Sequence, residues 1–327
     1  MTTETLTLQY QSQIAAAIKN MQWPAEPAEL YEPVRYIMSL GGKRMRPMLA
    51  VIGCGLFNGD IKKVLRPAIA LEVFHNFTLV HDDLMDNALV RRGKATVHNR
   101  WDMPTAILSG DVMLVFAYEL MMDADENKLR SAIELFNSTA RGVCEGQQLD
   151  MAYEIAEEID EARYTKMIGL KTAVLLAASL EMGALIAGAT QQERKNIYEC
   201  GYQLGIAFQI QDDLLDSYGE AKTFGKKIGG DILAGKKTYL AVKAFELADE
   251  STAKKLHHLF GRSTLSDDQR IMGVLDIYDR LGVKNVTETA RNSSYSRGIS
   301  LLNTVNGDLQ HKEMLISLAE SLVHRYA

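Results

Sequence analysis

The distribution of proline limits the fold of this chain more than any other feature of its sequence. All six prolines lie within the first 104 of its 327 residues. The rest of the chain is rich in Ala, Leu, Met, Glu and Lys, which favour helices. It contains no proline, the residue that interrupts helices most strongly. Because few segments alternate polar and β-branched residues as strands do, the sequence predicts an all-α protein.

Breaks that contain glycine divide the chain into expected helices. We expect about 12–13 of them, near residues 5–20, 28–39, 45–57, 62–86, 102–123, 127–150, 160–187, 191–217, 236–248, 250–260, 265–284, 286–303 and 308–325. No linker or low-complexity segment separates these helices. A single domain covering residues 1–327 is therefore expected.

Charge and composition exclude several classes of protein. An apolar content of 47% with 24% charged residues is typical of a soluble globular protein, and a net charge of −6 does not suit a nucleic-acid binder. The N-terminus lacks the basic and apolar regions of a signal peptide. The most apolar stretch, residues 173–189, contains Glu181 and is short for a membrane span. It predicts a buried core helix, and we expect no transmembrane segment.

The cysteines indicate a cellular compartment. They are odd in number, widely spaced and without a CxxC pair: Cys54, Cys144 and Cys200. This pattern is typical of reduced thiols in an intracellular protein rather than of a disulfide framework. The sequence therefore predicts a cytoplasmic protein.

One acidic pattern occurs twice, as DDLMD at residues 82–86 and as DDLLD at residues 212–216. Helix positions four apart share a face, so the first and last carboxylates of each copy point the same way. Such charges repel each other unless a cation lies between them, and oxygen ligands of this kind suit Mg²⁺ bound to substrate phosphates. The predicted metal ligands are Asp82, Asp83, Asp86, Asp212, Asp213 and Asp216.

Basic residues cluster in expected turns near both acidic patterns. They lie at residues 43–46, 91–94, 226–227 and 236–237. Any one cluster alone is more simply explained as a solvated surface. Their positions beside the acidic patterns indicate phosphate binding, because Arg offers bidentate contacts to phosphate and Lys a point charge. Together, the acidic and basic residues imply a polyphosphate substrate held through Mg²⁺.

Two polar features lie within apolar helices. His75 precedes Asp82 by seven residues, which places it two helical turns earlier on the same face. This alignment favours a role in substrate binding over a structural hydrogen bond. Lys171 and Thr172 interrupt an otherwise apolar segment, and a buried lysine needs a partner that a diphosphate could supply.

Taken together, these motifs resemble the trans-type (all-α) polyprenyl diphosphate synthases, the family of farnesyl and geranylgeranyl diphosphate synthases. The resemblance covers roughly residues 35–240. It implies an isoprenoid-synthase-type bundle of helices around a central cavity, and it suggests a homodimer. It also implies Mg²⁺ as the cofactor, about three ions per active site. The implied reaction is a head-to-tail condensation of isopentenyl diphosphate with dimethylallyl, geranyl or farnesyl diphosphate.

The resemblance also assigns roles to individual residues. The loop GGKRMRP at residues 41–47 matches the isopentenyl diphosphate loop of the family, and the implied ligands of that substrate are Lys43, Arg44, Arg46, His75 and Arg92. The implied ligands of the allylic diphosphate are Arg91, Lys171, Thr172, Gln209, Lys226 and Lys236. Catalysis is expected of Asp82, Asp86 and Asp212 through the metal. Lys171, Thr172 and Gln209 are expected to assist, the last two by offering oxygen dipoles to an allylic cation.

Two aromatic residues on the helix of the first acidic pattern address product length. Phe77 and Phe74 precede Asp82 by five and eight residues, or roughly 7.5 and 12 Å along a helix axis. Plain core packing is the simpler interpretation. The resemblance implies instead that they form the floor of the cavity for the growing chain, since short-chain members carry a large residue five positions before the motif. We therefore expect products of about C15 to C20.

Other functions stay open at this point. A medium- or long-chain synthase would share the same motifs. A class I terpene cyclase would share the fold but would not need the loop at residues 41–47 or an intact second acidic pattern. A non-catalytic subunit of a synthase usually loses one of its acidic patterns, and this chain retains both.

Overall fold

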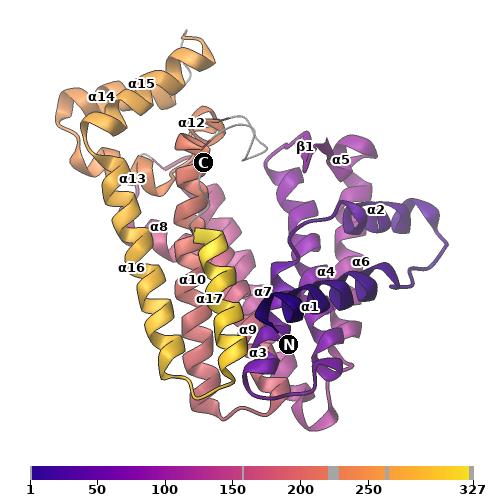
Figure 1. Ribbon diagram of the computed structural model, residues 1–327. Helices are drawn as coiled ribbons and strands as arrows, with labels where there is room; N and C mark the ends of the chain where they lie inside the picture. Colours follow the sequence, from indigo (N-terminus) through magenta and orange to yellow (C-terminus); the bar gives the residue numbers. More distant parts are fainter. Residues whose placement is uncertain (1, 157, 220–227, 262–264, 324–327) are drawn as a thin grey trace. The chain divides into compact units, whose positions relative to one another are not determined.

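The computed structural model describes residues 2–156, 158–219, 228–261 and 265–323, and they are almost entirely helical (Figure 1). The strands within these residues are β1 (Val90–Arg91) and β2 (Lys94–Ala95), which pair antiparallel in one short hairpin. The expected all-α fold class is confirmed.

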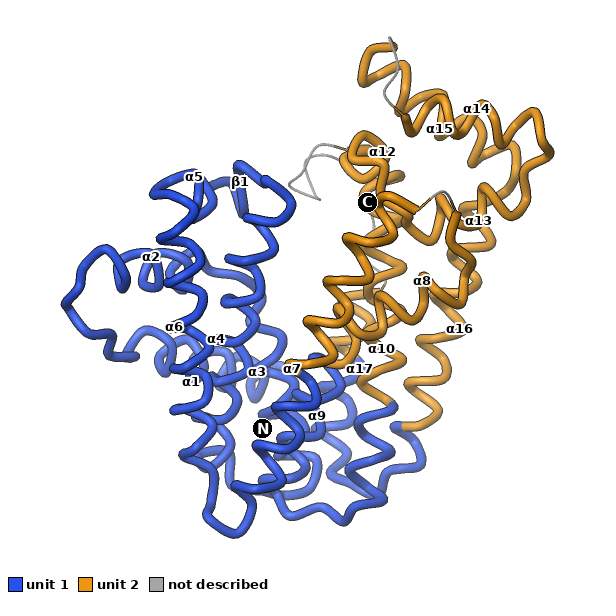
Figure 2. Tube along the Cα trace, turned by 180° about the vertical axis from the view of Figure 1, so that it is seen from behind, with its two compact units in different colours: residues 1–139, 175–199, 302–316 blue, residues 140–174, 200–301, 317–327 orange. Residues whose placement is uncertain are grey.

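The chain consists of two compact units (Figure 2). Unit 1 contains residues 1–139, 175–199 and 302–316, and unit 2 contains residues 140–174, 200–301 and 317–327. The boundary between the units falls well inside α7 (Glu126–Glu154), α10 (Gln191–Tyr218) and α17 (Leu309–Val323) and near one end of α9 (Val174–Ala187) and α16 (Val283–Thr304). The single domain expected from the sequence stays a prediction.

Unit 1 is built around one long helix, α4 (Ile61–Met85), which packs against α3 (Met45–Leu56) and α6 (Met103–Met121). Almost every residue of α3 is buried, as expected for a helix that is apolar on all sides. This unit also contains α1 (Thr3–Lys19), α2 (Ala28–Ser39), α5 (Val97–Arg100) and most of α9 (Val174–Ala187).

Small residues allow α3 and α9 to approach closely within unit 1. A Cβ atom on Gly53 would lie 2.3 Å from the carbonyl oxygen of Leu180, and one on Gly183 would lie 2.0 Å from that of Ala50. Both distances are shorter than van der Waals contact, so any larger residue would push the two helices apart. The apolar segment at residues 173–189 is thus the buried core helix that the sequence predicts.

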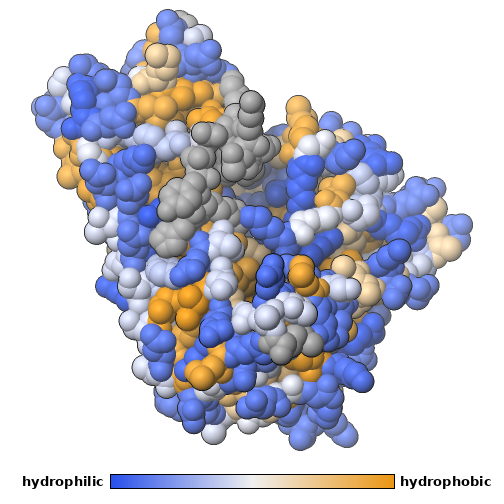
Figure 3. All heavy atoms as spheres, viewed as in Figure 1, coloured by the Kyte–Doolittle hydropathy of each residue, from blue (hydrophilic) through white to orange (hydrophobic). Residues whose placement is uncertain are grey.

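Unit 2 contains the end of α7, α8 (Glu161–Ile168), most of α10 and a series of shorter helices. These are α12 (Gly230–Ala234), α13 (Tyr239–Leu247), α14 (Glu250–Phe260), α15 (Asp267–Arg280) and most of α16 (Val283–Thr304). One apolar cluster joins α12 through α15, and a second joins α8, α10 and α13. The face in Figure 3 carries mainly hydrophilic side chains with smaller apolar patches between them.

Side-chain caps explain where several helices begin. Asp60, Asp102 and Asp249 each accept a hydrogen bond from a backbone N–H in the first turn of the helix that follows. Ser266 and Gln269 form a reciprocal capping box at the start of α15. The side chain of Thr238 accepts a hydrogen bond from the N–H of Ala241 and so caps α13. The helix expected from residue 236 therefore begins at Tyr239 instead.

The helix expected at residues 160–187 also differs from the prediction. It is a continuous helical segment, but a π-helical turn, η1 (Gly169–Ala173), separates α8 from α9. In this turn the N–H of Val174 donates to the carbonyl of Gly169, five residues earlier. An apolar run gives no periodicity from which one additional residue in a turn could be recognised.

Two of the described helical segments, Met103–Met121 and Glu161–Ala187, are long and apolar enough to span a membrane by length and composition alone. In the second, 72% of the apolar window is buried within the protein, which is the property of a core helix. In the first, the buried share is only 33%. One face of α6 is therefore apolar and uncovered.

Candidate active site

The first acidic pattern forms the C-terminal end of α4, and its three carboxylates have different surroundings. Asp86 is the C-cap residue and is exposed, and the side chain of Asp82 is 20% exposed. Asp83 is buried and accepts hydrogen bonds from Arg91 Nε at 2.9 and 2.8 Å. Burial raises the pKa of the Asp83 carboxyl, although its ion pair with Arg91 opposes the shift. Asp82 and Asp86 are thus the carboxylates best placed to reach a ligand.

Arg91 and Arg92 lie on the β hairpin that follows α4. Arg91 contacts Asp83 as described, and its Nη2 lies 3.9 Å from a carboxylate oxygen of Asp82. Arg92 occupies the turn in the left-handed region, at φ 52°, and donates to the carbonyl oxygen of Gly41. A Cβ atom on Gly42 would lie 2.9 Å from Arg92 Cζ, and Gly42 itself has φ 127°, so glycine is required there. The hairpin and the loop at residues 41–46 therefore meet.

An aromatic contact that the sequence analysis did not identify fixes this hairpin to α2. The hydroxyl of Tyr36 donates to the carbonyl oxygen of Ala95 at 2.7 Å. The guanidinium of Arg100 lies 4.4 Å from the ring centre of Tyr36 and 4.7 Å from that of Trp101. An aromatic residue one turn before the end of a short helix gave no signal of this role.

The expected ligand Arg44 is held by other protein groups. It adopts a left-handed conformation with φ 49°, and its guanidinium donates to Glu72 Oε1 at 2.7 Å and to the carbonyl oxygen of Met38 at 2.6 Å. Glu72, which the sequence analysis did not select, is 2% exposed and also accepts from Asn76. These contacts favour a role for Arg44 in shaping the loop over direct binding of substrate. Its expected binding of isopentenyl diphosphate stays a prediction.

Breaking this buried pair should destabilise the protein. We expect Arg44→Ala to lower the free energy of unfolding by ~3–5 kcal/mol, because the buried carboxylate of Glu72 loses its hydrogen-bonded ion-pair partner. Denaturation in urea measures the change. Arg130→Ala, which removes an exposed partner of Glu134, is the matched control and should cost less than ~1 kcal/mol. Equal losses in the two variants would contradict this interpretation of the buried pair.

Arg46 and His75 belong to one basic cluster with Arg44 and Arg92. Lys43, in the same loop as Arg44, is exposed. Arg46 Nε is buried and has no hydrogen-bond partner among the described residues. Burial lowers the pKa of Arg46 to about 10. Burial also lowers the pKa of His75 well below its ordinary value, and the nearby arginines lower it further, Arg46 and Arg92 most strongly. The arginines around the neutral imidazole of His75, and the buried N–H of Arg46 without a partner among the described residues, favour the binding of an anion.

The lowered pKa of His75 gives a pH dependence with a definite sign. Below about pH 6.5 the unfolded chain binds a proton at this imidazole that the folded chain does not. Stability contributed by the neutral histidine is therefore present above that pH and is lost as the pH falls. In His75→Gln, the free energy of unfolding should decrease less between pH 7.5 and 5.5 than in the wild type, measured by urea titrations at about these two values. Identical decreases would argue against a buried neutral imidazole.

The aromatic pair on α4 is packed against other rings. The ring centres of Phe74 and Phe77 are 5.6 Å apart, and Phe136 on α7 packs edge-on against Phe74 at 5.2 Å. Phe77 packs in the same way against His81 at 4.8 Å. Phe74 is 1% exposed and Phe77 is 9% exposed. Phe74 is thus a core residue, whereas Phe77 is closer to the acidic end of the helix. The role of either residue in product length stays a prediction.

Lys171 and Thr172 occupy the π turn in unit 2. The ammonium of Lys171 forms an ion pair with Asp150 on α7. The hydroxyl of Thr172 donates to Gln209 Oε1 at 2.9 Å, and Gln209 Nε2 donates in turn to Asp213 Oδ1 at 3.2 Å. The structure therefore links three of the predicted site residues in one hydrogen-bonded series.

The second acidic pattern lies near the C-terminal end of α10 and again divides into unlike carboxylates. Asp213 is 4% exposed and accepts from Tyr164 Oη and from the N–H of Tyr239, and burial raises its pKa to about 7. Asp216 accepts from the N–H of Asp231 at 3.0 Å, within the first turn of α12. Asp212 is partly exposed. In both patterns the first carboxylate is therefore more accessible than the second.

Of the two lysines expected to bind the allylic diphosphate after this pattern, the structure describes one. Lys236 lies between α12 and α13, is partly exposed, and its N–H donates to the carbonyl oxygen of Asp231 at 2.9 Å. Lys226 lies outside the described residues. Both assignments to the allylic diphosphate stay predictions.

The donor chemistry of the accessible carboxylates fits Mg²⁺. Within the described parts of the chain, no three side chains of His, Cys, Asp or Glu come together as a complete metal site. Mg²⁺ does not require one, because it commonly takes one or two carboxylates together with substrate phosphates and water. Asp82 and Asp86, at positions i and i+4 of one helix end, supply such a pair.

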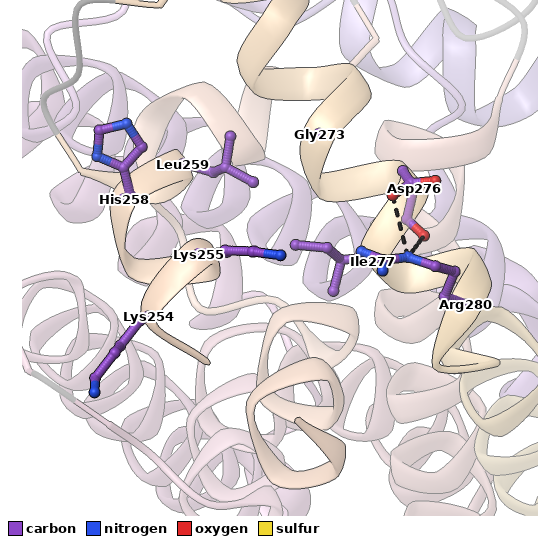
Figure 4. A pocket seen from close by; sticks show the side chains of 8 residues that line it. All are labelled: Lys254, Lys255, His258, Leu259, Gly273, Asp276, Ile277 and Arg280. Atoms are coloured by element: carbon purple, nitrogen blue, oxygen red, sulfur yellow. Dashed lines mark hydrogen bonds and ion pairs between the residues drawn. The ribbon is translucent and has the colours of Figure 1, made fainter. Parts of the chain in front are cut away.

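A separate pocket lies between α14 and α15 (Figure 4). Its basic residues do not converge on one point. Arg280 pairs with Asp276 at 3.1 Å, and Lys254 pairs with Glu250 and points away from the pocket in Figure 4. None of the motifs identified in the sequence lies in this pocket.

The fold and these sites define a class of protein: an all-α protein whose acidic patterns lie at the ends of two long helices, with basic residues in the turns that follow. The polyprenyl synthetase family model matches residues 27–277. The chain is 36% identical over 302 residues to a geranylgeranyl pyrophosphate synthase of Geoglobus acetivorans, covering 92% of each chain. It is 33% identical over 324 residues to a geranylgeranyl diphosphate synthase of Methanosarcina mazei, covering 96% of this chain and 95% of that one.

A solved structure of a geranylgeranyl pyrophosphate synthase is similar over the full length of both chains, with a TM-score of 0.91 and 38% identity. The chain belongs to the polyprenyl synthetase family. It is therefore an enzyme of the prenyl diphosphate synthase type, and the family expected from the sequence is confirmed. The family generally depends on Mg²⁺ and uses isopentenyl and allylic diphosphates.

Proposed function

We propose that this protein condenses isopentenyl diphosphate head to tail with an allylic diphosphate and releases a trans-prenyl diphosphate of about C15 to C20. The observation that supports this most strongly is the basic cluster in unit 1. There, Arg46 retains a buried N–H without a partner beside a neutral His75. Such a site suits the diphosphate of isopentenyl diphosphate, which takes no part in bond breaking and needs only to be held.

The reaction divides between two sets of residues. Lys43, Arg46, His75 and Arg92 would hold isopentenyl diphosphate, with Arg44 shaping their loop. Arg91, Lys171, Lys226 and Lys236 would bind the allylic diphosphate, and their charges would favour its departure as inorganic diphosphate. The allylic C–O bond breaks, the double bond of isopentenyl diphosphate supplies the electron pair for the new C–C bond, and a proton then leaves. We find no protein base in position among the described residues and assign the proton to the released diphosphate.

Mg²⁺, when bound, would act as a Lewis acid that neutralises the charge of the leaving diphosphate. Asp82, Asp86 and Asp212 are the residues that would hold it, about three ions in all. Asp83, Asp213 and Asp216, which are satisfied by Arg91, Tyr164 and Asp231 respectively, would act by orienting the neighbouring helix ends rather than as direct ligands. Thr172 and Gln209 would present oxygen atoms toward the cation.

One experiment tests the proposed function directly. Purified protein is incubated with isopentenyl diphosphate, Mg²⁺ and dimethylallyl, geranyl or farnesyl diphosphate in turn, and the products are sized by chromatography after removal of phosphate. We expect linear prenyl alcohols of 15 to 20 carbons, as for a short-chain synthase. Cyclic hydrocarbons formed without isopentenyl diphosphate would indicate a cyclase, and no product with any primer would indicate a non-catalytic subunit.

We further propose that the protein is a cytoplasmic homodimer and that α6 forms the contact between its subunits. Leu108 and Val115 of α6 and Met122, its C-cap residue, are spaced by seven residues, which places them on one face, and they are 59%, 54% and 62% exposed. Exposed apolar side chains that form such a stripe on one face of a helix favour contact with another protein surface. A second copy of the same helix supplies a stripe that matches it.

Charges on this stripe should separate the subunits. In Leu108→Glu/Val115→Glu, we expect the molar mass from light scattering to fall from that of two chains to that of one, because like charges would face each other in an apolar contact. Met272→Glu, at an apolar position of α15 that is 71% exposed, is the matched control and should leave the mass unchanged. A dimer that persists in the double variant would exclude α6, and a wild-type monomer that binds lipid vesicles would indicate a membrane face instead.

A further inference from the structure

The π turn that carries Lys171 and Thr172 is surrounded by glycines on two neighbouring helices. A Cβ atom on Gly146 of α7 would lie 2.2 Å from the backbone nitrogen of Lys171. One on Gly205 of α10 would lie 2.6 Å from the Cα atom of Ala173. Both contacts are made to backbone, which cannot move aside as the end of a flexible side chain can. The turn therefore fits between α7 and α10 only because both positions lack a side chain.

Each of these glycines is followed, four residues later, by the group that receives a polar side chain from the turn. On α7, Gly146 precedes Asp150, the partner of Lys171. On α10, Gly205 precedes Gln209, the partner of Thr172. Residues four apart lie on one face of a helix. Each neighbouring helix thus presents a glycine to the backbone of the turn and an acceptor to its side chain, one helical turn apart.

The π turn explains why both arrangements are needed together. Consecutive residues of an α-helix point about 100° apart. Here Lys171 is directed to α7 and Thr172 to α10. The wider turn, closed by the bond from Val174 N–H to the Gly169 carbonyl, displaces the backbone outward by the thickness of one additional residue. Glycine at 146 and 205 provides the space for that displacement. The acceptors then determine where the ammonium and the hydroxyl come to rest.

We propose that Gly146, Asp150 and Gly205 are positioning residues that hold the π turn so that Lys171 and Thr172 can act on the allylic diphosphate. This inference rests on the proposed function for its consequence in catalysis, although the packing itself does not. A methyl group at position 146 or 205 would displace the turn. Misplacement of catalytic groups by about 1 Å can cost on the order of 10²-fold in rate. The effect should be confined to the allylic substrate, since the residues expected to hold isopentenyl diphosphate belong to unit 1.

Gly53→Ala is the matched control for this test. A Cβ atom there would lie 2.3 Å from the carbonyl oxygen of Leu180, so the crowding is similar, but it falls in the core of unit 1. We expect Gly146→Ala and Gly205→Ala to lower kcat at least ~10-fold and to change KM for the allylic diphosphate, with KM for isopentenyl diphosphate within about twofold. Gly53→Ala should lower Tm without this division between the two substrates. If all three variants behave alike, the glycines serve only packing and the inference is wrong.

A readout that does not need catalysis separates this inference from the proposed function. Hydrogen exchange of peptides covering residues 165–175 should be faster in Gly146→Ala and Gly205→Ala than in the wild type, and faster than in Gly53→Ala, whose clash falls at Leu180, beyond these peptides. If the wild type forms no product, the proposed function fails while exchange still decides the packing. If the alanine variants do not fold, Asp150→Asn adds no atom and should raise KM for the allylic diphosphate at least ~5-fold. An unchanged KM in Asp150→Asn would then overturn the inference.

Discussion

Asp82→Ala should reduce turnover by at least ~10³-fold while the protein remains folded, because the variant loses a carboxylate that would hold Mg²⁺ against the leaving diphosphate. The residue is well suited to this test. Its side chain is 20% exposed, and Arg91 Nη2 lies 3.9 Å from one of its carboxylate oxygens. The carboxylate of Asp82 is thus more accessible than that of Asp83, the buried partner of Arg91. Steady-state rates with saturating isopentenyl and allylic diphosphates, together with Tm, measure both parts of the expectation.

Two comparisons make this result specific. Asp123→Ala removes a surface carboxylate of the same unit that pairs with Arg66, and it should leave turnover unchanged. Asp83→Ala should differ in kind, since it removes the buried partner of Arg91 and should lower Tm as well as activity. Full activity of Asp82→Ala would show that Asp82 of the first acidic pattern is not needed for catalysis.

Product length should change when the aromatic pair on α4 is truncated. We expect Phe77→Ala/Phe74→Ala to release products longer by at least one five-carbon unit, because the two rings would no longer close the space into which the chain grows. Phe74 is 1% exposed and packs against Phe136, so the double variant should also lose ~3–5 kcal/mol of stability. Chromatographic sizing of the prenyl alcohols, measured at a temperature well below Tm, checks the first expectation.

The single variant Phe77→Ala distinguishes the two rings. Phe77 is 9% exposed and lies nearer to the acidic end of the helix, so most of the lengthening should already occur there, at a smaller cost in stability. Phe116→Ala is the control, because this ring packs against Trp23 and Tyr31 rather than along α4. Products of unchanged length in both α4 variants would show that these aromatic residues are core residues only.

The sequence was sufficient to predict the helices, because their signals are local. The expected helices begin within three residues of the expected position, and a short-range cap explains the three-residue difference at α13, where the Thr238 side chain accepts from the N–H of Ala241. The acidic patterns were also visible, since carboxylates in apolar helices are costly unless they have a function. The expected helices at residues 62–86 and 191–217 placed both patterns near the C-terminal ends of helices, where the structure has them.

The sequence could not distinguish the members of each acidic pattern, because the distinction depends on contacts from distant segments. Asp83 is satisfied by Arg91 and Asp213 by Tyr164, 49 residues earlier. Glu72 could have been noticed as an acidic residue within an apolar run, and the same principle that selected the aspartates would have predicted a buried partner. The π turn, in contrast, follows from the lack of side chains on two other helices and has no local signal.

The ion pair between Arg91 and Asp83 has a consequence for the pace of the catalytic cycle. A guanidinium that already has a carboxylate at 2.7 Å is partly neutralised before any substrate arrives. If Arg91 binds the allylic diphosphate as we propose, it would hold that group less tightly than an unpaired arginine, and it would return to its own carboxylate when inorganic diphosphate departs. An enzyme that must expel one diphosphate before every new condensation gains more from rapid exchange at this position than from affinity.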